Sequence, residues 1–146
     1  FTYRNWDLNF FLRGSVGHDL VNTFRAFYEA PGVATSYNVV NTEYFDPNLD
    51  DAPRFNSYHV EDADFLRLDN ATLGYNVQLS EGVLLSRLRL YVSAQNLFTI
   101  TNYTGVDPEV RLVDAANGDD PLAPGIDRRN TWFTTRGYTF GVNLSF

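Results

Sequence analysis

Carboxylates that stand close together are the residues of this chain best suited to chemistry. Glu61, Asp62 and Asp64 form one acidic cluster, and adjacent aspartates stand at positions 50–51 and 119–120. Such groups can bind calcium or act as an acid and base pair. None of them has the spacing of a known ion-binding loop, so the sequence favours solvated acidic loops over a calcium site or a catalytic pair.

Other kinds of catalytic or metal site find little support. His18 and His59 are the only histidines, they stand far apart in the sequence, and two ligands do not make a metal site. Cysteine is absent, which excludes thiolate chemistry, and neither a Gly-x-Ser-x-Gly motif nor a phosphate-binding loop occurs. We therefore expect no catalytic residues, no metal, no cofactor and no enzymatic activity.

Aromatic residues in polar segments are better candidates for ligand binding. Tyr103 and Trp132 fall in one long polar segment with Asn102, Arg128 and Arg129. A sugar ring can stack on such an aromatic side chain while carboxylate and guanidinium groups hydrogen-bond its hydroxyls. The alternative, in which these residues pack within a loop or anchor its base, is favoured by the sequence alone.

Composition excludes several classes of protein. No apolar run approaches the roughly 18 residues of a membrane-spanning helix, although 16% of the 146 residues are aromatic. Every basic residue is arginine, the net charge is −7, and the largest basic cluster is the pair Arg128 and Arg129. Nucleic acid is therefore not an expected partner. No targeting signal opens the chain, which predicts a mature chain or an internal fragment.

Four segments alternate apolar with small polar residues, which is the period of a β-strand with two different faces. We expect strands near 5–16, 64–79, 87–100 and 136–146, and no helix, which makes the fold all-β. The apolar face of the last segment consists of Tyr138, Phe140, Val142, Leu144 and Phe146.

The polar faces of these strands are mostly small and uncharged, and aromatic residues stand near the strand ends. Both features are typical of a transmembrane β-barrel with a lipid-facing band and aromatic girdles. A soluble β-sandwich gives the same alternation, so periodicity alone leaves both architectures open. The unequal connections favour a barrel, because a short turn joins the second and third strands while long loops near 17–63 and 101–135, expected to be extracellular, follow the first and third.

Three separated motifs carry a resemblance to a known family. They are Phe65-Leu66-Arg67-Leu68 with Thr72-Leu73-Gly74-Tyr75, then Gln95-Asn96-Leu97-Phe98 followed by Gly105-Val106-Asp107-Pro108-Glu109, and finally the last strand. In this order they resemble the C-terminal end of SusC-like TonB-dependent transporters. The stretch Asp107-Pro108-Glu109 is interpreted as a structural turn, because proline fixes its backbone.

The resemblance implies a fold and a set of partners for the whole protein. It implies a large antiparallel barrel of about 22 strands, with an N-terminal plug that is not in this chain, in the outer membrane of a Gram-negative, Bacteroidetes-type bacterium. It also implies a SusD-like surface lipoprotein, a TonB complex that acts through the missing N-terminal part, and import of oligosaccharides or peptides. Physical reasoning agrees that four strands are incomplete, because a sheet that spans a bilayer must close on itself.

Two other functions stay open beside the importer. One is a passive outer-membrane barrel or anchor assembled from several chains, which the long loops disfavour. The other is a soluble β-sandwich that binds glycans, which the small uncharged polar faces disfavour. A last strand that ends in an aromatic residue also resembles the signal read by the barrel-assembly machinery, which pairs with an exposed strand edge. We expect the apolar face of that strand to meet lipid and to serve in this recognition.

Overall fold

The computed structural model describes residues 1–29, 48, 56–80, 82, 84–110, 125–128 and 133–146. The chain divides into two compact units. Unit 1 comprises Phe1–Gly14, Leu66–Ile100 and Thr134–Phe146, and unit 2 comprises Ser15–Phe65 and Thr101–Phe133. Among the described residues, no helix is both long enough and apolar enough to cross a membrane.

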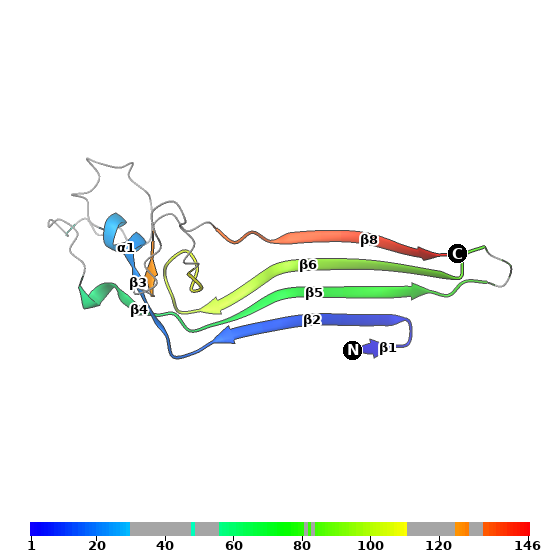
Figure 1. Ribbon diagram of the computed structural model, residues 1–146, viewed down its shortest axis with the longest axis horizontal. Helices are drawn as coiled ribbons and strands as arrows, with labels where there is room; N and C mark the ends of the chain where they lie inside the picture. Colours follow the sequence, from blue (N-terminus) through cyan, green and yellow to red (C-terminus); the bar gives the residue numbers. More distant parts are fainter. Residues whose placement is uncertain (30–47, 49–55, 81, 83, 111–124, 129–132) are drawn as a thin grey trace. The chain divides into compact units, whose positions relative to one another are not determined.

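Unit 1 is built from long neighbouring strands that run in alternating directions (Figure 1). The five strands of its sheet lie in the order β1-β2-β5-β6-β8. Their bounds are Thr2–Tyr3 for β1, Trp6–Ser15 for β2, Phe65–Val77 for β5, Arg87–Thr101 for β6 and Gly137–Ser145 for β8. The four longer strands arise from the four alternating segments, so the all-β sheet expected from the period of two is confirmed.

The pairing of β6 with β8 sorts apolar and polar residues onto opposite faces of the sheet. Leu90 lies opposite Val142 and Val92 lies opposite Phe140, whereas the intervening Tyr91 lies opposite Gly141. The apolar face is open, and Phe140 is 81% exposed. Alternate residues of β2 add to this exposed apolar face: Trp6, Leu8, Phe10 and Leu12. A face of this size needs a cover, and lipid is the cover that a barrel strand has.

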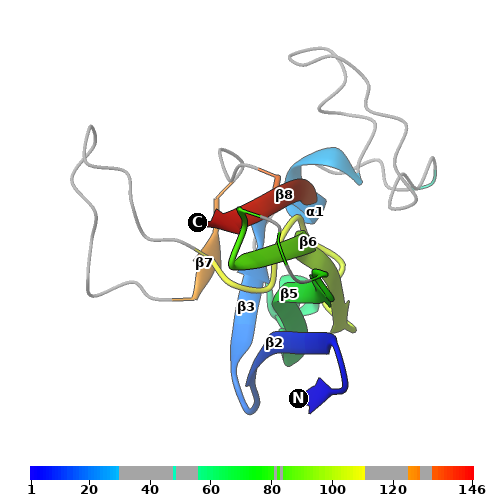
Figure 2. The same ribbon diagram turned by 90° about the vertical axis from the view of Figure 1, so that its right-hand side faces the viewer.

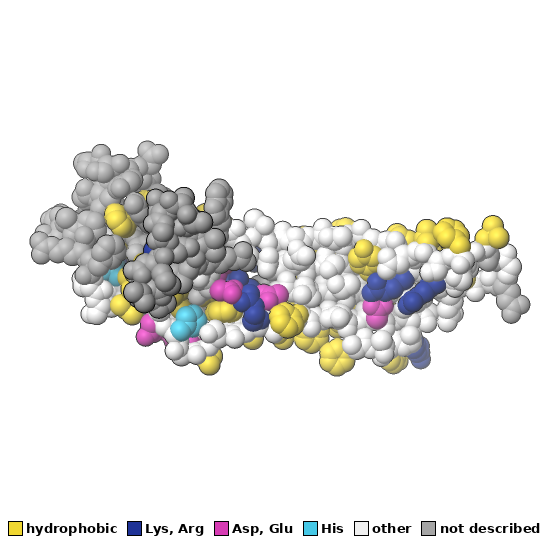
Figure 3. Space-filling view, viewed as in Figure 1, with side chains coloured by type: hydrophobic (Ala, Val, Ile, Leu, Met, Phe, Trp, Pro, Cys, Tyr) yellow, Lys and Arg dark blue, Asp and Glu magenta, His cyan; other side chains and the backbone are white. Residues whose placement is uncertain are grey.

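Two glycines make room for large side chains on the polar face of unit 1. Arg89 of β6 reaches across β5 to Asp7 of β2, with its Nε 2.9 Å from the Asp7 carboxylate, and a Cβ on Gly74 would collide with both side chains. The ring of Tyr91 covers Gly141 in the same way. Basic and acidic side chains gather at two places along the strands in Figure 3. The polar face is therefore packed laterally, by side chains that span neighbouring strands.

Unit 2 corrects the expectation that no helix forms, and it adds short strands within the segments expected to be long loops. Its short elements are β3 (Asp19–Asn22), α1 (Thr23–Tyr28), the 3-10 helix η2 (Ser57–His59), β4 (Val60–Asp62) and β7 (Ile126–Asp127). The middle strand, β3, pairs antiparallel with β4 and parallel with β7 (Figures 1 and 2). These elements escape sequence analysis because each has two to six residues, which is too short for a hydrophobic period to repeat.

The two faces of β8 should respond differently to a buried charge. Replacing Val142 by Arg is expected to cost roughly 2–4 kcal/mol of stability for a site near the bilayer midplane, because the guanidinium would enter lipid. Replacing the adjacent Asn143 by Arg should cost much less, since its side chain leaves the opposite face of the strand. Refolding of the two variants of the complete protein into lipid vesicles measures both costs, and equal costs would contradict the assignment of faces.

Candidate functional site

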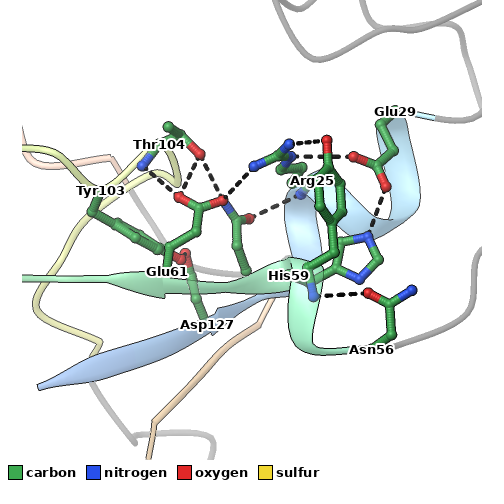
Figure 4. Close-up of polar contacts among 10 residues, drawn as sticks. Arg25, Glu29, Asn56, His59, Glu61, Tyr103, Thr104 and Asp127 are labelled. Atoms are coloured by element: carbon green, nitrogen blue, oxygen red, sulfur yellow. Dashed lines mark hydrogen bonds and ion pairs between the residues drawn. The ribbon is translucent and has the colours of Figure 1, made fainter.

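A connected set of polar side chains fastens the described segments of unit 2 to one another (Figure 4). We call it the Glu61 network, and it consists of Asn22, Thr23, Arg25, Glu29, His59, Glu61, Tyr103, Thr104 and Asp127. Its members come from β3 and α1, from η2 and β4, from the segment after β6, and from β7. Asn22, His59 and Asp127 are almost completely buried.

Glu61 is the centre of this network. One carboxylate oxygen accepts hydrogen bonds from the backbone N–H and the hydroxyl of Thr104, at 2.9 and 2.6 Å. The other accepts from Asn22 Nδ2 and Arg25 Nη1, both at 3.2 Å. Its side chain is only 12% exposed. Burial alone would raise the pKa of Glu61, but the donors, led by Thr104, outweigh burial and hold that pKa below its usual value.

Asn22 both starts α1 and joins that helix to the network. Its Oδ1 accepts a hydrogen bond from the backbone N–H of Arg25 at 2.9 Å, which is the N-cap contact expected of asparagine. Its Nδ2 donates to Glu61 and also to Thr104 Oγ1 at 3.2 Å. Asn22 is 0% exposed, so each of these bonds forms away from water. A single amide therefore fixes the helix start and joins three segments.

Arg25 and Glu29 extend the network along α1. Arg25 Nε donates to Glu29 Oε2 at 3.2 Å, one helical turn further on, and its guanidinium lies 4.3 Å from the centre of the Tyr58 ring. The other Glu29 oxygen lies 2.7 Å from Nε2 of the buried His59. Charged and aromatic groups from η2 and α1 thus hold one another in place.

Asp127 attaches β7 to the rest of unit 2. Its carboxylate accepts a 2.7 Å hydrogen bond from the Tyr103 hydroxyl, and its backbone carbonyl accepts one from the Thr23 hydroxyl. The ring of Tyr103 belongs to a small hydrophobic cluster with Leu20 and Ala63. Polar and apolar contacts therefore hold the same segments together.

The residues predicted to bind a ligand have different settings in the structure. Tyr103 is only 6% exposed and its hydroxyl is bonded to Asp127, so it is a packing residue here and offers no open ring face to a sugar. Asn102 is exposed and Arg128 is partly exposed. The Tyr103 hydroxyl bonds Asp127, which precedes Arg128 in the sequence. Trp132 and Arg129 lie outside the described residues.

One member of the acidic cluster, Glu61, is not in the solvated loop that the sequence favoured, whereas Asp62 and the side chain of Asp64 are exposed. Glu61 lies in β4 opposite Leu20 of β3, a pairing that draws its side chain into unit 2. Asp62 accepts from the backbone N–H of Asp64 at 2.8 Å, and Asp64 accepts from that of Gly17. The part of the chain that the structure describes contains no group of three or more His, Asp or Glu arranged to hold a metal. The aspartates at 50–51 and 119–120 lie outside the described residues.

The predicted turn at Asp107-Pro108-Glu109 is confirmed. Asp107 Oδ1 accepts a hydrogen bond from the backbone N–H of Glu109 at 2.9 Å, which is the side-chain turn that aspartate favours. The Pro108 carbonyl lies 3.3 Å from Nε2 of His18, so the turn also contacts the connection near 17–63. Hydrogen bonds among the described polar groups of unit 2 therefore hold its segments together.

Comparison with known proteins identifies the family. No family model matches the chain. TonB-dependent receptor P3 of Formosa agariphila is 32% identical over 99% of this chain and 15% of the relative. TonB-dependent receptor SusC of Bacteroides thetaiotaomicron is 32% identical over 79% of this chain and 12% of the relative. This chain belongs to the SusC-like TonB-dependent receptors. It spans about 15% of the length of the first of these relatives.

Solved structures agree with this assignment. The RagAB peptide importer in its closed-closed state matches 99% of this chain with a TM-score of 0.71 and 26% identity, over 16% of that chain. The same importer in its open-open state matches 97% with a TM-score of 0.69 and 26% identity. The sheet of unit 1 is therefore part of a large transmembrane barrel. The family is one of receptors and importers, not enzymes.

The Glu61 network should make unit 2 sensitive to acid. The pKa of Glu61 is lower in the folded protein than in the unfolded chain, where it is about 4.3. Glu61 therefore contributes stability above the unfolded pKa, and this contribution is lost as the pH falls through the folded pKa. Glu61→Gln should remove the contribution at neutral pH, at a cost of about 1–3 kcal/mol. Amide hydrogen exchange of Thr104 and Arg25 in the full receptor, followed from neutral to acid pH, measures it.

Asp62→Asn is the matched control, because Asp62 is exposed and its carboxylate bonds the backbone N–H of Asp64. This variant should keep the neutral-pH protection of Thr104. Wild-type and Glu61→Gln receptors with the same protection at neutral pH would show that Glu61 does not hold unit 2 together.

Proposed function

We propose that this chain is part of an outer-membrane importer that takes up oligosaccharides or peptides in a TonB-dependent manner, in a Gram-negative, Bacteroidetes-type bacterium. The observation that carries the proposal is the likeness of nearly the whole chain to SusC-like receptors and to the RagAB peptide importer. The relatives and structures named above are receptors and an importer, so we do not propose the passive anchor or the soluble β-sandwich that the sequence left open.

The two faces of unit 1 suit this role. The exposed apolar face, with Phe140 and Val142, fits the hydrocarbon of a bilayer. The opposite face carries the Asp7–Arg89 ion pair and a 2.9 Å hydrogen bond between Thr72 and Ser93. Such groups are costly in lipid and favourable beside water or protein, so we infer that this face lines the interior of the barrel.

We infer that the importer works with a SusD-like surface lipoprotein and draws energy from a TonB complex. The family supports the lipoprotein partner, because the matched relatives and structures include SusC and RagAB. The TonB contact, the remaining barrel strands and the plug belong to parts of the receptor outside this chain. The connections near 17–63 and 101–135 would then be extracellular, with Asn102 and Arg128 as candidate contacts to cargo.

Uptake by cells tests the import function directly. Cells that carry the full receptor and its lipoprotein should take up a labelled peptide pool or a labelled oligosaccharide pool, and cells without the receptor should not. Uptake should stop when the TonB complex is deleted, because transport would then lack its energy source. Uptake that survives this deletion would indicate a passive pore and contradict the proposed function.

We further propose that the last strand is the signal for barrel assembly. Within the described sheet β8 pairs on one side with β6 and forms an edge, and Phe146 beyond it is 88% exposed. An exposed edge can add to a partner strand, while alternate side chains give selectivity. The side chains that would do so are Tyr138, Phe140, Val142, Leu144 and Phe146.

Deletion of Phe146 should therefore lower the amount of assembled receptor in cells far more than it impairs refolding in detergent. The loss of one aromatic side chain that lipid or detergent covers accounts for only about 1.5–3 kcal/mol, which would affect both settings alike. Leu90→Ala, in the neighbouring strand β6 and on the same face but outside the proposed signal, is the control for lost apolar surface. Equal modest losses in cells and in detergent would leave Phe146 an ordinary interfacial anchor.

A further inference from the structure

We infer that the described segments of unit 2 stay joined as one body during uptake, so that they form a fixed part of the importer and not its gate. The segments are 15–29, 56–65, 101–110 and 125–128. They come from both long connections, the first near 17–63 and the second near 101–135. The inference rests on the proposed import function, because it concerns what the connections do while cargo passes.

The backbone ties both connections to the same strand. β3 pairs with β4 through Val21 opposite Val60, and with β7 through Val21 opposite Ile126. The Val21 N–H donates to the Gly125 carbonyl at 2.7 Å, and the Ala63 N–H donates to the His18 carbonyl at 3.0 Å. The second connection therefore cannot separate from the first unless the backbone hydrogen bonds between β3 and the β7 region break.

The Glu61 network crosses the same junction through Thr104, Glu61 and the fully buried Asn22. Separation of Thr104 from β4 would take two donors from the Glu61 carboxylate, which is 12% exposed. It would also take Thr104 Oγ1 from the fully buried Asn22 amide. Buried groups that lose their partners carry a desolvation penalty, so parting is opposed at several points at once.

Apolar packing opposes the same movement. Tyr103 from the second connection packs against Leu20 and Ala63 from the first, and its hydroxyl bonds Asp127. Parting of the two connections would expose this ring and break that bond together. A gate needs two arrangements of similar free energy, whereas here the ladder, the polar network and the apolar cluster all favour one arrangement.

A reversible cross-link between the two connections tests the inference. Val21→Cys with Ile126→Cys places two thiols on neighbouring strands, about 4.8 Å apart at Cα, within the roughly 4.4–6.8 Å that disulfides span. The chain has no cysteine of its own to interfere. With the cargo pool that the wild-type receptor imports, we expect the oxidised and reduced forms of this variant to import at the same rate.

Leu90→Cys with Val142→Cys is the matched control, because these residues face each other in the wall of unit 1. Loss of uptake on oxidation of the unit 2 pair alone, with recovery on reduction, would show that the connections must part, and the inference would be wrong. Failure of the wild-type receptor to import either pool would instead overturn the proposed function. The two failures are thus distinguishable.

Hydrogen exchange of the unmodified receptor gives a second test that does not depend on disulfide formation. The N–H groups of Val21, Ala63 and Thr104 all donate across the segments of unit 2. Their protection should stay the same with and without the lipoprotein and the imported cargo pool. A large loss of protection at these three amides when cargo is added would contradict a body that stays joined.

Discussion

A carboxylate that leaves water must find donors in the protein, and this requirement shapes unit 2. Glu61 meets it with an amide from β3, a guanidinium from α1, and the hydroxyl and backbone N–H of Thr104. Because these donors come from separate segments, the carboxylate is satisfied only when the segments are assembled. Glu61 therefore makes the folding of one long connection depend on the other, and Asp127 extends that dependence to β7 through Tyr103.

Unit 1 obeys a different constraint. Its strands carry exposed apolar residues on one face, which would meet bilayer lipid in the proposed importer, and polar residues on the other, where Asp7 and Arg89 pair across Gly74. In hydrocarbon every backbone donor needs a partner, so a strand of this sheet is stable only with strands on both sides. The long pairing of β6 with β8 supplies one of these two sides to β8 over nine residue pairs, from Arg87 opposite Ser145 to Gln95 opposite Gly137.

The difference between the two constraints explains what could be predicted from the sequence. A period of two repeats many times in a long strand, so the alternation in 87–100 and 136–146 was enough to find β6 and β8 and to sort their faces. The turn at Asp107-Pro108-Glu109 was also predictable, because proline and aspartate act locally. Glu61 was not, since its role arises from Asn22 and Thr104, which are distant in sequence. The one local sign in that region is Asn22 as a helix cap, and a single asparagine is a weak signal for a helix of six residues.

Tyr103 shows why residue type alone misassigns a site in such a protein. An aromatic residue in a polar segment looks like a ligand platform, yet a connection that folds without lipid needs an apolar core of its own, and Tyr103 supplies part of it with Leu20 and Ala63. Its hydroxyl serves a second purpose, because the buried Asp127 carboxylate needs a donor. A contact to cargo needs exposed atoms, which the packed ring of Tyr103 lacks. Among the predicted residues that the structure describes, Asn102 is exposed and Arg128 is partly exposed, so in the proposed importer these two are better candidates than Tyr103 although neither is aromatic.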